Sequence, residues 1–383
     1  MSAMDSGTTS LSATHPRVTD LPTAPPLAAG SSASPCQVYD VALLDLDGVV
    51  YVGPHAVPGV PSALGAARAA GMRLGFVTNN AARTPEQVAV HLTELGVPAE
   101  ASDVITSSQA AATVVADLLE PGAPVLAVGG PGVAAALTAA GLTVVDRAED
   151  QPAAVVQGYG RDVGWSHLAE AVVAIRDGAR HVATNNDLTI PSPRGPLPGN
   201  GALVGVVSAV TGQSPLVTGK PDPAMHAECV RRTGARRPLV VGDRLDTDIE
   251  GARRVGVESL LVFSGVTDPA VLLAAGPQHR PDLLAGDAAG LVRPHPPVTT
   301  DGSSWRCRGW TARAAEGADV LVLDGRGADE HVGGDGLDGL RALCAAHWSR
   351  HPDQAATVRV VAAGPRAEEA LDRWGLTARP PAD

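Results

Sequence analysis

The sequence is poor in aromatic residues and has no long apolar run. Phe, Trp and Tyr make up 3% of the 383 residues, which disfavours a binding site that stacks on a nucleobase or another flat ring. No apolar stretch is long enough to cross a bilayer, and the N-terminus has no basic segment followed by an apolar one. We therefore expect no membrane partner and no signal peptide.

Cysteine and positive charge are also scarce. The four cysteines are scattered without a C-x-x-C pair, which argues against a zinc site and favours reduced thiols in the cytoplasm. Asp and Glu number 41 against 29 Lys and Arg, so the formal net charge is −12. This balance argues against nucleic acid as a partner. It says little about small anions, because one local cation can reverse the field inside a pocket.

What the sequence has instead is an alternation of short apolar runs with helical patterns. This alternation predicts an α/β fold with a mostly parallel sheet and helices on both faces. The expected strands are 41–44, 74–77, 104–106, 216–218, 239–241 and 259–263, and the expected helices are 62–70, 85–95, 109–119, 223–233 and 246–255. A second alternation has expected strands at 125–128, 144–145 and 153–157, helices at 131–140 and 165–177, and an ordered Pro/Gly-rich loop at 191–201.

Two carboxylates follow the first of these strands. Asp45 and Asp47 lie in the run Asp45-Leu46-Asp47-Gly48-Val49-Val50-Tyr51, directly after 41–44. Side chains two residues apart on a strand point the same way, and ligands of open α/β sheets bind at the strand ends. Two carboxylates this close repel each other unless a cation or a shared proton relieves them. The pair therefore predicts a metal site.

Three further motifs each follow an expected strand. Thr78-Asn79-Asn80 offers a hydroxyl and backbone N–H groups, which suit a phosphate oxygen. Gly219-Lys220-Pro221 offers a cation. The run 242–248 contains Asp243 and Asp248 and offers carboxylate oxygens, which Mg²⁺ prefers. A lone Asp at a strand end is usually a cap or turn residue, so it is the order of all four motifs that points to one site.

In this order the four motifs resemble the signature loops of the haloacid dehalogenase (HAD) superfamily of phosphatases. The match is closest to class IIA, the p-nitrophenylphosphatase group, which includes phosphoglycolate and glycerol-3-phosphate phosphatases. The resemblance implies a Rossmann-like HAD core with a parallel sheet and an inserted α/β cap domain. It covers about 36–292, which divides into a core of 36–120 plus 216–292 and a cap of 121–215.

The resemblance also implies a covalent mechanism with Mg²⁺ as cofactor. Asp45 would be the nucleophile, and Asp47 the general acid and base. Mg²⁺ would be bound by Asp45, by the backbone carbonyl of Asp47, and by Asp243, while Asp248 would orient Lys220 or a metal-bound water. Residues after the other strands would hold the transferring phosphoryl group, namely Thr78, Asn79, Asn80 and Lys220.

A second Thr-Asn-Asn, at 184–186, lies inside the expected cap. Together with Asp187 and the run Pro198-Gly199-Asn200-Gly201, it resembles the cap signature of the same group. The resemblance implies that Asp187 and Asn200 take part in substrate recognition. A structural role for Asp187 is at least as well supported.

The substrate class follows from the resemblance and from the composition of the cap. Its aromatic residues are Tyr159 and Trp165, which favours a small phosphorylated metabolite such as glycerol 3-phosphate or phosphoglycolate over a nucleotide or pyridoxal phosphate. A catalytically silent phosphate sensor and a phosphomutase or phosphotransferase are the rival hypotheses. The intact Asp45–Asp47 pair argues against the sensor. Cap-to-cap dimers occur in the group, so the resemblance also admits a homodimer.

Both ends of the chain lie outside this resemblance. Residues 1–35 are interpreted as a disordered tail, or as sequence upstream of the true start, and 293–301 as a Pro-rich linker. Residues 302–383 hold four of the five tryptophans and are expected to form a small C-terminal α/β domain. Members of this architecture include phosphatases whose tail resembles part of an acetyltransferase fold. No R-x-x-G-x-G/A acyl-CoA loop follows residue 302, so a structural or interaction role is preferred.

Overall fold

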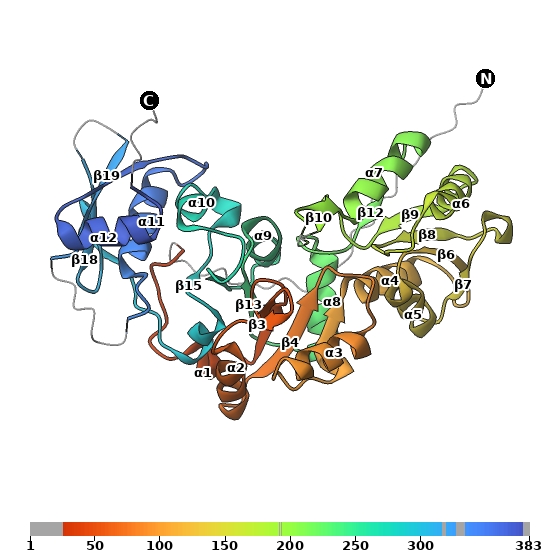
Figure 1. Ribbon diagram of the computed structural model, residues 1–383, viewed down its shortest axis with the longest axis horizontal. Coiled ribbons are helices and arrows are strands. Elements are labelled where there is room, and N and C mark those ends of the chain that lie inside the picture. The colour runs from red at the N-terminus through yellow and green to blue at the C-terminus, as the bar shows by residue number, and fades with distance from the viewer. Residues whose placement is uncertain (1–25, 191, 193, 316–318, 327–333, 378–383) are drawn as a thin grey trace, which may run out of the picture.

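The computed structural model describes residues 26–190, 192, 194–315, 319–326 and 334–377. Three units lie in a row, with the core that carries β1 in the middle, the cap at one end and the C-terminal unit at the other (Figure 1). The expected α/β fold with parallel sheets is confirmed. Among the described residues, no helix combines the length and hydropathy that a membrane span requires.

The core is built on a parallel sheet with β1 near its centre. Over the described residues its strand order is β15 (Leu283–Ala285), β14 (Ser259–Val262), β13 (Pro238–Gly242), β1 (Val41–Asp45), β4 (Arg73–Thr78) and β5 (Val104–Thr106). The chain adds β4 and β5 on one side of β1, and later β13, β14 and β15 on the other. The strand order therefore reverses beside β1, and such a reversal opens a ligand site at the carboxyl ends of the strands.

Helices cover the core sheet, and their starts follow the expected capping rules. α3 (Pro85–Glu94) begins with a capping box formed by Thr84 and Gln87. α8 (Pro223–Thr233) begins after Asp222, whose carboxylate accepts the backbone N–H of Ala224. The remaining described elements of the core are α1 (Pro35–Val38), β2 (Tyr51–Val52), β3 (His55–Ala56), α2 (Val60–Ala69), η1 (Ala101–Asp103), η3 (Leu245–Ile249), α9 (Glu250–Arg254), α10 (Pro269–Leu273), η4 (Pro277–His279) and η5 (Ala288–Val292).

The expected helix 246–255 is wrong in its first half. Leu245–Ile249 forms the π-helical turn η3, and the α-helix α9 begins only at Glu250. In η3 the Asp248 carboxylate turns back and accepts the backbone N–H of Arg244 at 3.2 Å. A Cβ atom on Gly242 would collide with the Asp248 side chain, so this turn depends on glycine there.

The cap has its own parallel sheet and includes elements that the sequence patterns missed. Its described strands run in the order β12 (Leu216–Val217), β9 (Arg180–Ala183), β8 (Ala154–Gln157), β6 (Pro124–Val128) and β7 (Thr143–Val145). Its helices are α5 (Pro131–Ala139), α6 (Trp165–Arg176) and α7 (Asn200–Thr211), with the turn η2 (Ala148–Asp150), and α4 (Ser107–Leu118) packs between α5 and α8 of the core. We did not expect β9 or α7.

Two expectations about the cap need correction. The stretch 191–201 is not all loop, because β10 (Thr189–Ile190) pairs with β11 (Leu197–Pro198) and α7 starts at Asn200. Residues 191 and 193 lie outside the described part of the chain. Strand β12 pairs with β9 in the cap sheet, although we had assigned 216 onward to the core.

The C-terminal unit combines a mixed sheet with two described helices. The strand order is β16 (Thr299–Thr300), β17 (Ser304–Cys307), β18 (Trp310–Ala314), β19 (Val320–Asp324) and β20 (Arg359–Ala362). Only the β19–β20 pair is parallel among these described strands. α11 (Asp338–Arg350) lies against β17 and β18, and α12 (Pro365–Arg373) lies against β20.

The segments expected to be a free tail and a linker are partly built into the fold. Residues 1–25 of the expected tail lie outside the described residues, but Leu27 is buried and α1 forms in the core. Ser31 pairs with His295 through two backbone hydrogen bonds of 2.7 and 2.8 Å. His295 is itself buried, so the 293–301 segment is an ordered junction rather than a free linker.

Candidate active site

The four motifs meet at the carboxyl edge of the core sheet. Asp45 ends β1, Thr78 ends the neighbouring strand β4, and Asp243 directly follows β13 on the other side of β1. Lys220 comes from the loop between β12 and α8, and Asp248 from η3. Parallel strands bring their carboxyl ends to one edge, which is why motifs far apart in the sequence come together here.

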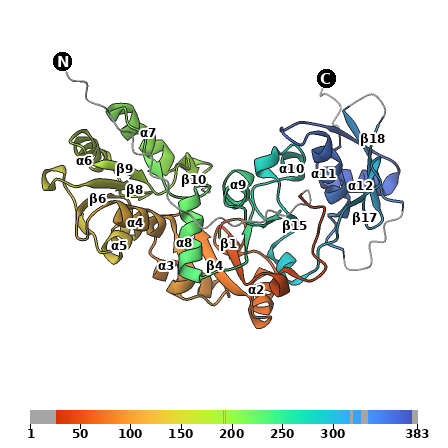
Figure 2. The same cartoon turned by 180° about the vertical axis from the view of Figure 1, so that it is seen from behind.

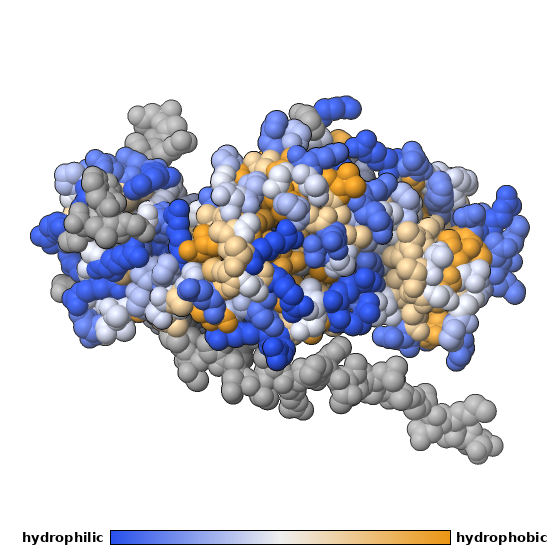
Figure 3. Space-filling model, turned by 90° about the horizontal axis from the view of Figure 1, so that it is seen from below, coloured by the Kyte–Doolittle hydropathy of each residue, from blue (hydrophilic) through white to orange (hydrophobic). Residues whose placement is uncertain are grey.

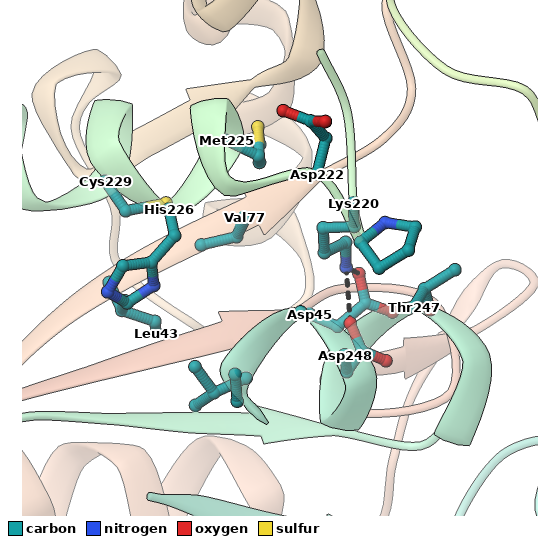
Figure 4. A pocket seen from close by; sticks show the side chains of 14 residues that line it. Leu43, Asp45, Val77, Lys220, Asp222, Met225, His226, Cys229, Thr247 and Asp248 are labelled. Atoms are coloured by element: carbon teal, nitrogen blue, oxygen red, sulfur yellow. Dashed lines mark hydrogen bonds and ion pairs between the residues drawn. The ribbon is translucent and has the colours of Figure 1, made fainter. Parts of the chain in front are cut away.

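Lys220 lies between two carboxylates. Its Nζ atom is 2.6 Å from Asp45 Oδ1 and 2.7 Å from Asp248 Oδ1 (Figure 4). These side chains are only 12%, 14% and 1% exposed for Lys220, Asp45 and Asp248, respectively. Burial opposes the charged ammonium, but the two carboxylates outweigh it and raise the pKa of Lys220 above its usual value. Lys220 is therefore a fixed positive charge beside Asp45.

The Asp45 carboxylate is mostly buried and is paired with the ammonium group of Lys220. Burial raises the pKa of Asp45 to about 7, while Lys220 opposes that shift and Asp248 adds to it. The other side of Lys220 borders a cavity of about 30 Å³, lined by Met225, Cys229 and other residues that face the sheet (Figure 4). That cavity holds about one water molecule, so it does not accommodate a substrate.

Asp243 has a carboxylate oxygen with no protein partner. Asp243 Oδ2 accepts the backbone N–H of Val266 at 2.7 Å, whereas buried Oδ1 accepts no hydrogen bond from the described residues. Oxygen atoms of Asp45, Asp243 and Asp248 lie within 4.8 Å of one another. Burial, followed by the Asp248 charge, raises the pKa of Asp243 to about 6. Crowded carboxylates with an unpartnered oxygen fit a hard divalent cation.

The turn after β1 fixes Asp47 beside this cluster. Gly48 has φ +85°, and a Cβ atom there would collide with the Asp243 carboxylate, so glycine lets the turn approach. Asp47 is exposed, and the Tyr51 hydroxyl lies near its carboxylate. Partial desolvation raises the pKa of Asp47, which favours the protonated form that can act as an acid.

The Asn79 side chain makes hydrogen bonds to Lys220 and Asp187 that the sequence did not predict. Its Oδ1 accepts the backbone N–H of Lys220 at 2.9 Å, and its Nδ2 donates to the Lys220 carbonyl at 3.2 Å and to Asp187 Oδ2 at 3.3 Å. The buried Thr78 hydroxyl accepts the Asn80 N–H, and the Asn80 side chain accepts the Ala82 N–H. Thr78-Asn79-Asn80 thus forms a tight turn. Through Asn79 it makes hydrogen bonds both to Lys220 and to Asp187 of the cap.

The cap residues divide into one near the core and one buried in the cap. Asp187 reaches the core through Asn79, and burial raises the pKa of its carboxyl group. Asn200 is 1% exposed, and its Nδ2 donates to the carbonyls of Asn185 at 2.8 Å and Gln157 at 3.2 Å. The structure therefore brings Asp187, but not Asn200, to the edge of the core site.

Sequence reasoning missed the loop 264–267, which holds two of the motifs together. Ser264 Oγ donates to the Gly48 carbonyl at 2.6 Å, the Val266 N–H donates to Asp243, and the Thr267 N–H donates to the Asp243 carbonyl. No residue in this loop has a side chain that points to catalysis from sequence alone. Tyr51 lies within the first motif, and its position there is the one signal that could have singled it out.

Comparisons with known proteins match parts of this chain and also most of its length. A haloacid dehalogenase-like hydrolase model matches residues 42–143, and an HAD-hydrolase-like model matches 217–291. A GCN5-related N-acetyltransferase like domain matches 307–376. The D-glycerol 3-phosphate phosphatase of Mycobacterium tuberculosis is 43% identical over 350 residues, which is 89% of this chain and 95% of that protein.

Other relatives match a smaller share of this chain. The acid sugar phosphatase of Staphylococcus aureus is 38% identical over 231 residues, which is 60% of this chain and 88% of that protein. Its match therefore leaves a large part of this chain uncovered.

Some solved structures match nearly the whole chain, and others match about two thirds of it. The glycerol phosphate phosphatase of M. tuberculosis has TM-scores of 0.82 with calcium and 0.79 with magnesium, at 41% identity. These comparisons cover 91% and 90% of this chain, and 100% and 99% of the other. A p-nitrophenyl phosphatase from Archaeoglobus fulgidus has a TM-score of 0.62 at 28% identity, over 66% of this chain and 98% of that one. The chain belongs to the haloacid dehalogenase-like hydrolase family.

Proposed function

We propose that this protein is a Mg²⁺-dependent phosphatase that hydrolyses a small phosphate monoester, with glycerol 3-phosphate as the preferred substrate. The observation that carries the proposal is the buried Lys220 between Asp45 and Asp248, next to the unpartnered oxygen of Asp243. A nucleophilic carboxylate, a fixed cation and a cation site at one sheet edge are the groups that phosphoryl transfer requires.

In the first chemical step, a carboxylate oxygen of Asp45 attacks phosphorus. The new O–P bond forms as the bond to the leaving oxygen breaks, and protonated Asp47 gives its proton to that oxygen. The product is an aspartyl-phosphate on Asp45 and a free alcohol. Lys220 stabilises the ionised form of Asp45 before attack and the charge on the phosphoryl oxygens during it.

The second step returns the enzyme to its starting state. Asp47, now ionised, takes a proton from a water molecule, and the water oxygen attacks phosphorus. The bond between phosphorus and the Asp45 oxygen breaks, which releases inorganic phosphate and restores the carboxylate. The Tyr51 hydroxyl, which lies near the Asp47 carboxylate, would help to orient it in both steps. Thr78, Asn79 and Asn80 form the turn at which the phosphoryl oxygens would be bound.

The residues that would bind Mg²⁺ are Asp45, Asp243 and the backbone carbonyl of Asp47. When bound there, Mg²⁺ would supply positive charge that screens the repulsion between the anionic nucleophile and the anionic substrate. Asp248 lies in the same carboxylate cluster, but its Oδ1 is occupied by Lys220 and its Oδ2 by the Arg244 N–H. Its proposed task is therefore to orient Lys220.

The preference for glycerol 3-phosphate rests on the coverage of the comparisons and on the cap. The relative named as a D-glycerol 3-phosphate phosphatase spans 89% of this chain, including most of the C-terminal unit, whereas the acid sugar phosphatase spans 60%. Phosphoglycolate is the second candidate. Nucleotides and pyridoxal phosphate are disfavoured because the cap has few aromatic rings on which to stack. The four buried free cysteines support a cytoplasmic location.

A phosphate-release screen tests the proposal. The esters are glycerol 3-phosphate, phosphoglycolate, a nucleoside monophosphate and pyridoxal phosphate, each assayed with Mg²⁺ and with EDTA. We expect the highest kcat/KM on glycerol 3-phosphate and no turnover with EDTA. Asp45→Asn should lower kcat by roughly a thousandfold or more. Asp40→Asn is the matched control, because Asp40 accepts the backbone N–H groups of Arg236 and Arg237 away from the site.

Each outcome of that screen bears on a different part of the proposal. Turnover that survives EDTA or Asp45→Asn would contradict the mechanism. Comparable rates on every ester would contradict only the substrate preference. Binding of phosphate esters without any turnover would favour the sensor hypothesis, and transfer to an added alcohol in preference to water would favour a phosphotransferase.

A further inference from the structure

The C-terminal unit packs firmly against the core. One hydrophobic cluster contains Leu340 and Leu343 of α11 together with Leu245 and Ile249 of η3. Figures 1 and 2 both show α10 between α9 and α11. The face of the unit seen in Figure 3 is largely hydrophilic, and the apolar colour gathers over the middle and the opposite end. The apolar residues of α11 in this cluster thus pack against the turn that carries Asp248.

One hydrogen bond links the C-terminal unit to the loop that holds Asp243. The buried indole Nε1–H of Trp348 donates to the carbonyl of Leu273, the last residue of α10, at 3.2 Å. The loop just before α10 provides the Val266 N–H that binds Asp243 Oδ2. The same loop provides Ser264, which binds the Gly48 carbonyl. A shift of α10 would therefore move the donors that orient Asp243.

A second link runs to Asp248. Arg280 is 5% exposed, and its guanidinium donates to the carbonyls of His351 at 2.6 Å, Pro352 at 3.0 Å and Gln354 at 3.1 Å. The guanidinium also lies 5.4 Å from the Trp348 ring centroid. In turn, Arg253 of α9 donates to the Arg280 carbonyl at 2.6 and 2.8 Å. α9 continues directly from η3, so this chain of contacts ends at the turn that carries Asp248.

The described residues around the N-terminus of α11 include two carboxylates of the same unit, Asp335 and Asp338. The N-terminus of α11 is the helix end that would favour an anionic ligand. There Asp335 accepts the backbone N–H of Leu337 at 3.0 Å, and Asp338 and Asp335 both pair with buried Arg341. Arg341 also donates to the Leu284 carbonyl of β15 at 2.6 Å. Among the described residues, these contacts attach α11 to β15 of the core.

We propose that the C-terminal unit positions two active-site carboxylates, the metal ligand Asp243 and the Lys220 partner Asp248, with Trp348 and Arg280 as positioning residues. The inference rests on the proposed function for the identity of the metal ligands. It assigns the unit a task in the phosphatase reaction without a ligand or activity of its own. Loss of the Trp348 or the Arg280 contacts would leave Asp243 and Asp248 in place but less well oriented. We expect this to weaken Mg²⁺ binding more than it changes the rate of the reaction once Mg²⁺ is bound.

Calorimetric titration of the full-length protein with MgCl₂ tests this inference. The variants are Trp348→Phe, which removes the N–H donor, and Arg280→Lys, which keeps the charge but loses the spread of donors. Trp374→Phe is the matched control, because Trp374 is buried in the same unit against Trp310 at 6.2 Å between ring centroids. Circular dichroism melts identify a temperature at which every variant is folded.

We expect the Mg²⁺ dissociation constant to rise roughly threefold to tenfold in Trp348→Phe and in Arg280→Lys, but not in Trp374→Phe. The Mg²⁺ concentration for half-maximal turnover should rise in parallel, while kcat at saturating Mg²⁺ returns toward the wild-type value. Unchanged Mg²⁺ binding in both variants would overturn the inference, as would equal weakening in Trp374→Phe or a wild type that binds no Mg²⁺. A wild type that binds Mg²⁺ but hydrolyses no ester would instead overturn the proposed function.

Discussion

The cap and the C-terminal unit contact the same core in different ways. Beside the site, the cap contacts the core through polar side chains, with Asn185 Nδ2 donating to the Asn79 carbonyl at 2.7 Å and Asp187 accepting from Asn79. A separate apolar cluster joins α4 to α5 of the cap. The C-terminal unit uses a continuous apolar cluster and the buried Arg280 and Arg341. Hydrogen bonds beside a ligand site exchange with water at little cost, whereas buried packing is costly to lose.

The difference indicates that the contacts of the cap serve substrate binding and that the contacts of the C-terminal unit serve stability. The polar contacts of the cap lie where the substrate's leaving group must be accommodated, so their net contribution to stability should be small. The buried contacts of the C-terminal unit lie behind the metal-site loops, so they should contribute strongly to stability and geometry. The following changes test the comparison, in order of expected effect.

The largest effect is expected from Arg341→Met. The change removes the buried guanidinium that joins Asp335, Asp338 and the Leu284 carbonyl, and it leaves Asp338 with only the exposed Arg308 as a cation. We expect the free energy of unfolding to fall by about 3–5 kcal/mol, measured by urea denaturation. Arg326→Met is the control, because Arg326 pairs with Asp324 at a site where the arginine side chain is 83% exposed. Equal effects of the two changes would break the comparison.

The next largest effect is a pH dependence of the free energy of unfolding, caused by His181 inside the cap. His181 is 5% exposed, and burial lowers its pKa to about 4 from 6.5. Between these values the unfolded chain binds a proton that the folded chain does not, so stability present above pH 6.5 is lost as the pH falls toward 4. The loss should reach about 3 kcal/mol.

The pH effect is measured by urea denaturation of wild type and His181→Gln across this range. The variant should lose stability less steeply, while His55→Gln, which changes an exposed histidine, should follow the wild type. Parallel curves for wild type and His181→Gln would show that His181 does not stay neutral inside the folded cap.

The smallest stability effect is expected from Asp187→Ala. Among the described residues, its partly buried carboxylate accepts one hydrogen bond from the core, from Asn79 Nδ2 at 3.3 Å. We expect the free energy of unfolding to change by under about 1 kcal/mol, while KM for glycerol 3-phosphate rises. Urea denaturation and initial-rate kinetics measure the two quantities. A loss of stability as large as that of Arg341→Met, with KM unchanged, would make Asp187 a structural residue like those of the C-terminal unit.

The core of the fold and the main site residues could be predicted because their signals are local. Each of Asp45, Thr78 and Asp243 ends or follows a buried apolar strand, and parallel strands bring such positions to one edge. The helices expected at 85–95 and 223–233 start where the sequence placed them, since their N-caps Thr84 and Asp222 act over three or four positions.

The features that could not be predicted depend on distant contacts or on ambiguous patterns. Asn79 pairs with the backbone of Lys220, 141 residues away. α7 has apolar residues both inside and outside, with Val207 buried and Val210 59% exposed, so it lacks the one-sided pattern of a surface helix. The turn η3 departs from a regular helix because Asp248 turns toward Lys220, a tertiary contact with no local signal.

The most direct test of the central claim is to trap the covalent intermediate. Asp47→Asn should still permit attack on p-nitrophenyl phosphate, because nitrophenolate leaves without a proton, but it should slow hydrolysis of the aspartyl-phosphate. After acid quenching with Mg²⁺ present, peptide mass spectrometry should find one phosphoryl group on Asp45. A quenched Asp47→Asn protein that releases nitrophenol yet carries no phosphoryl group, or carries it on another residue, would contradict the account.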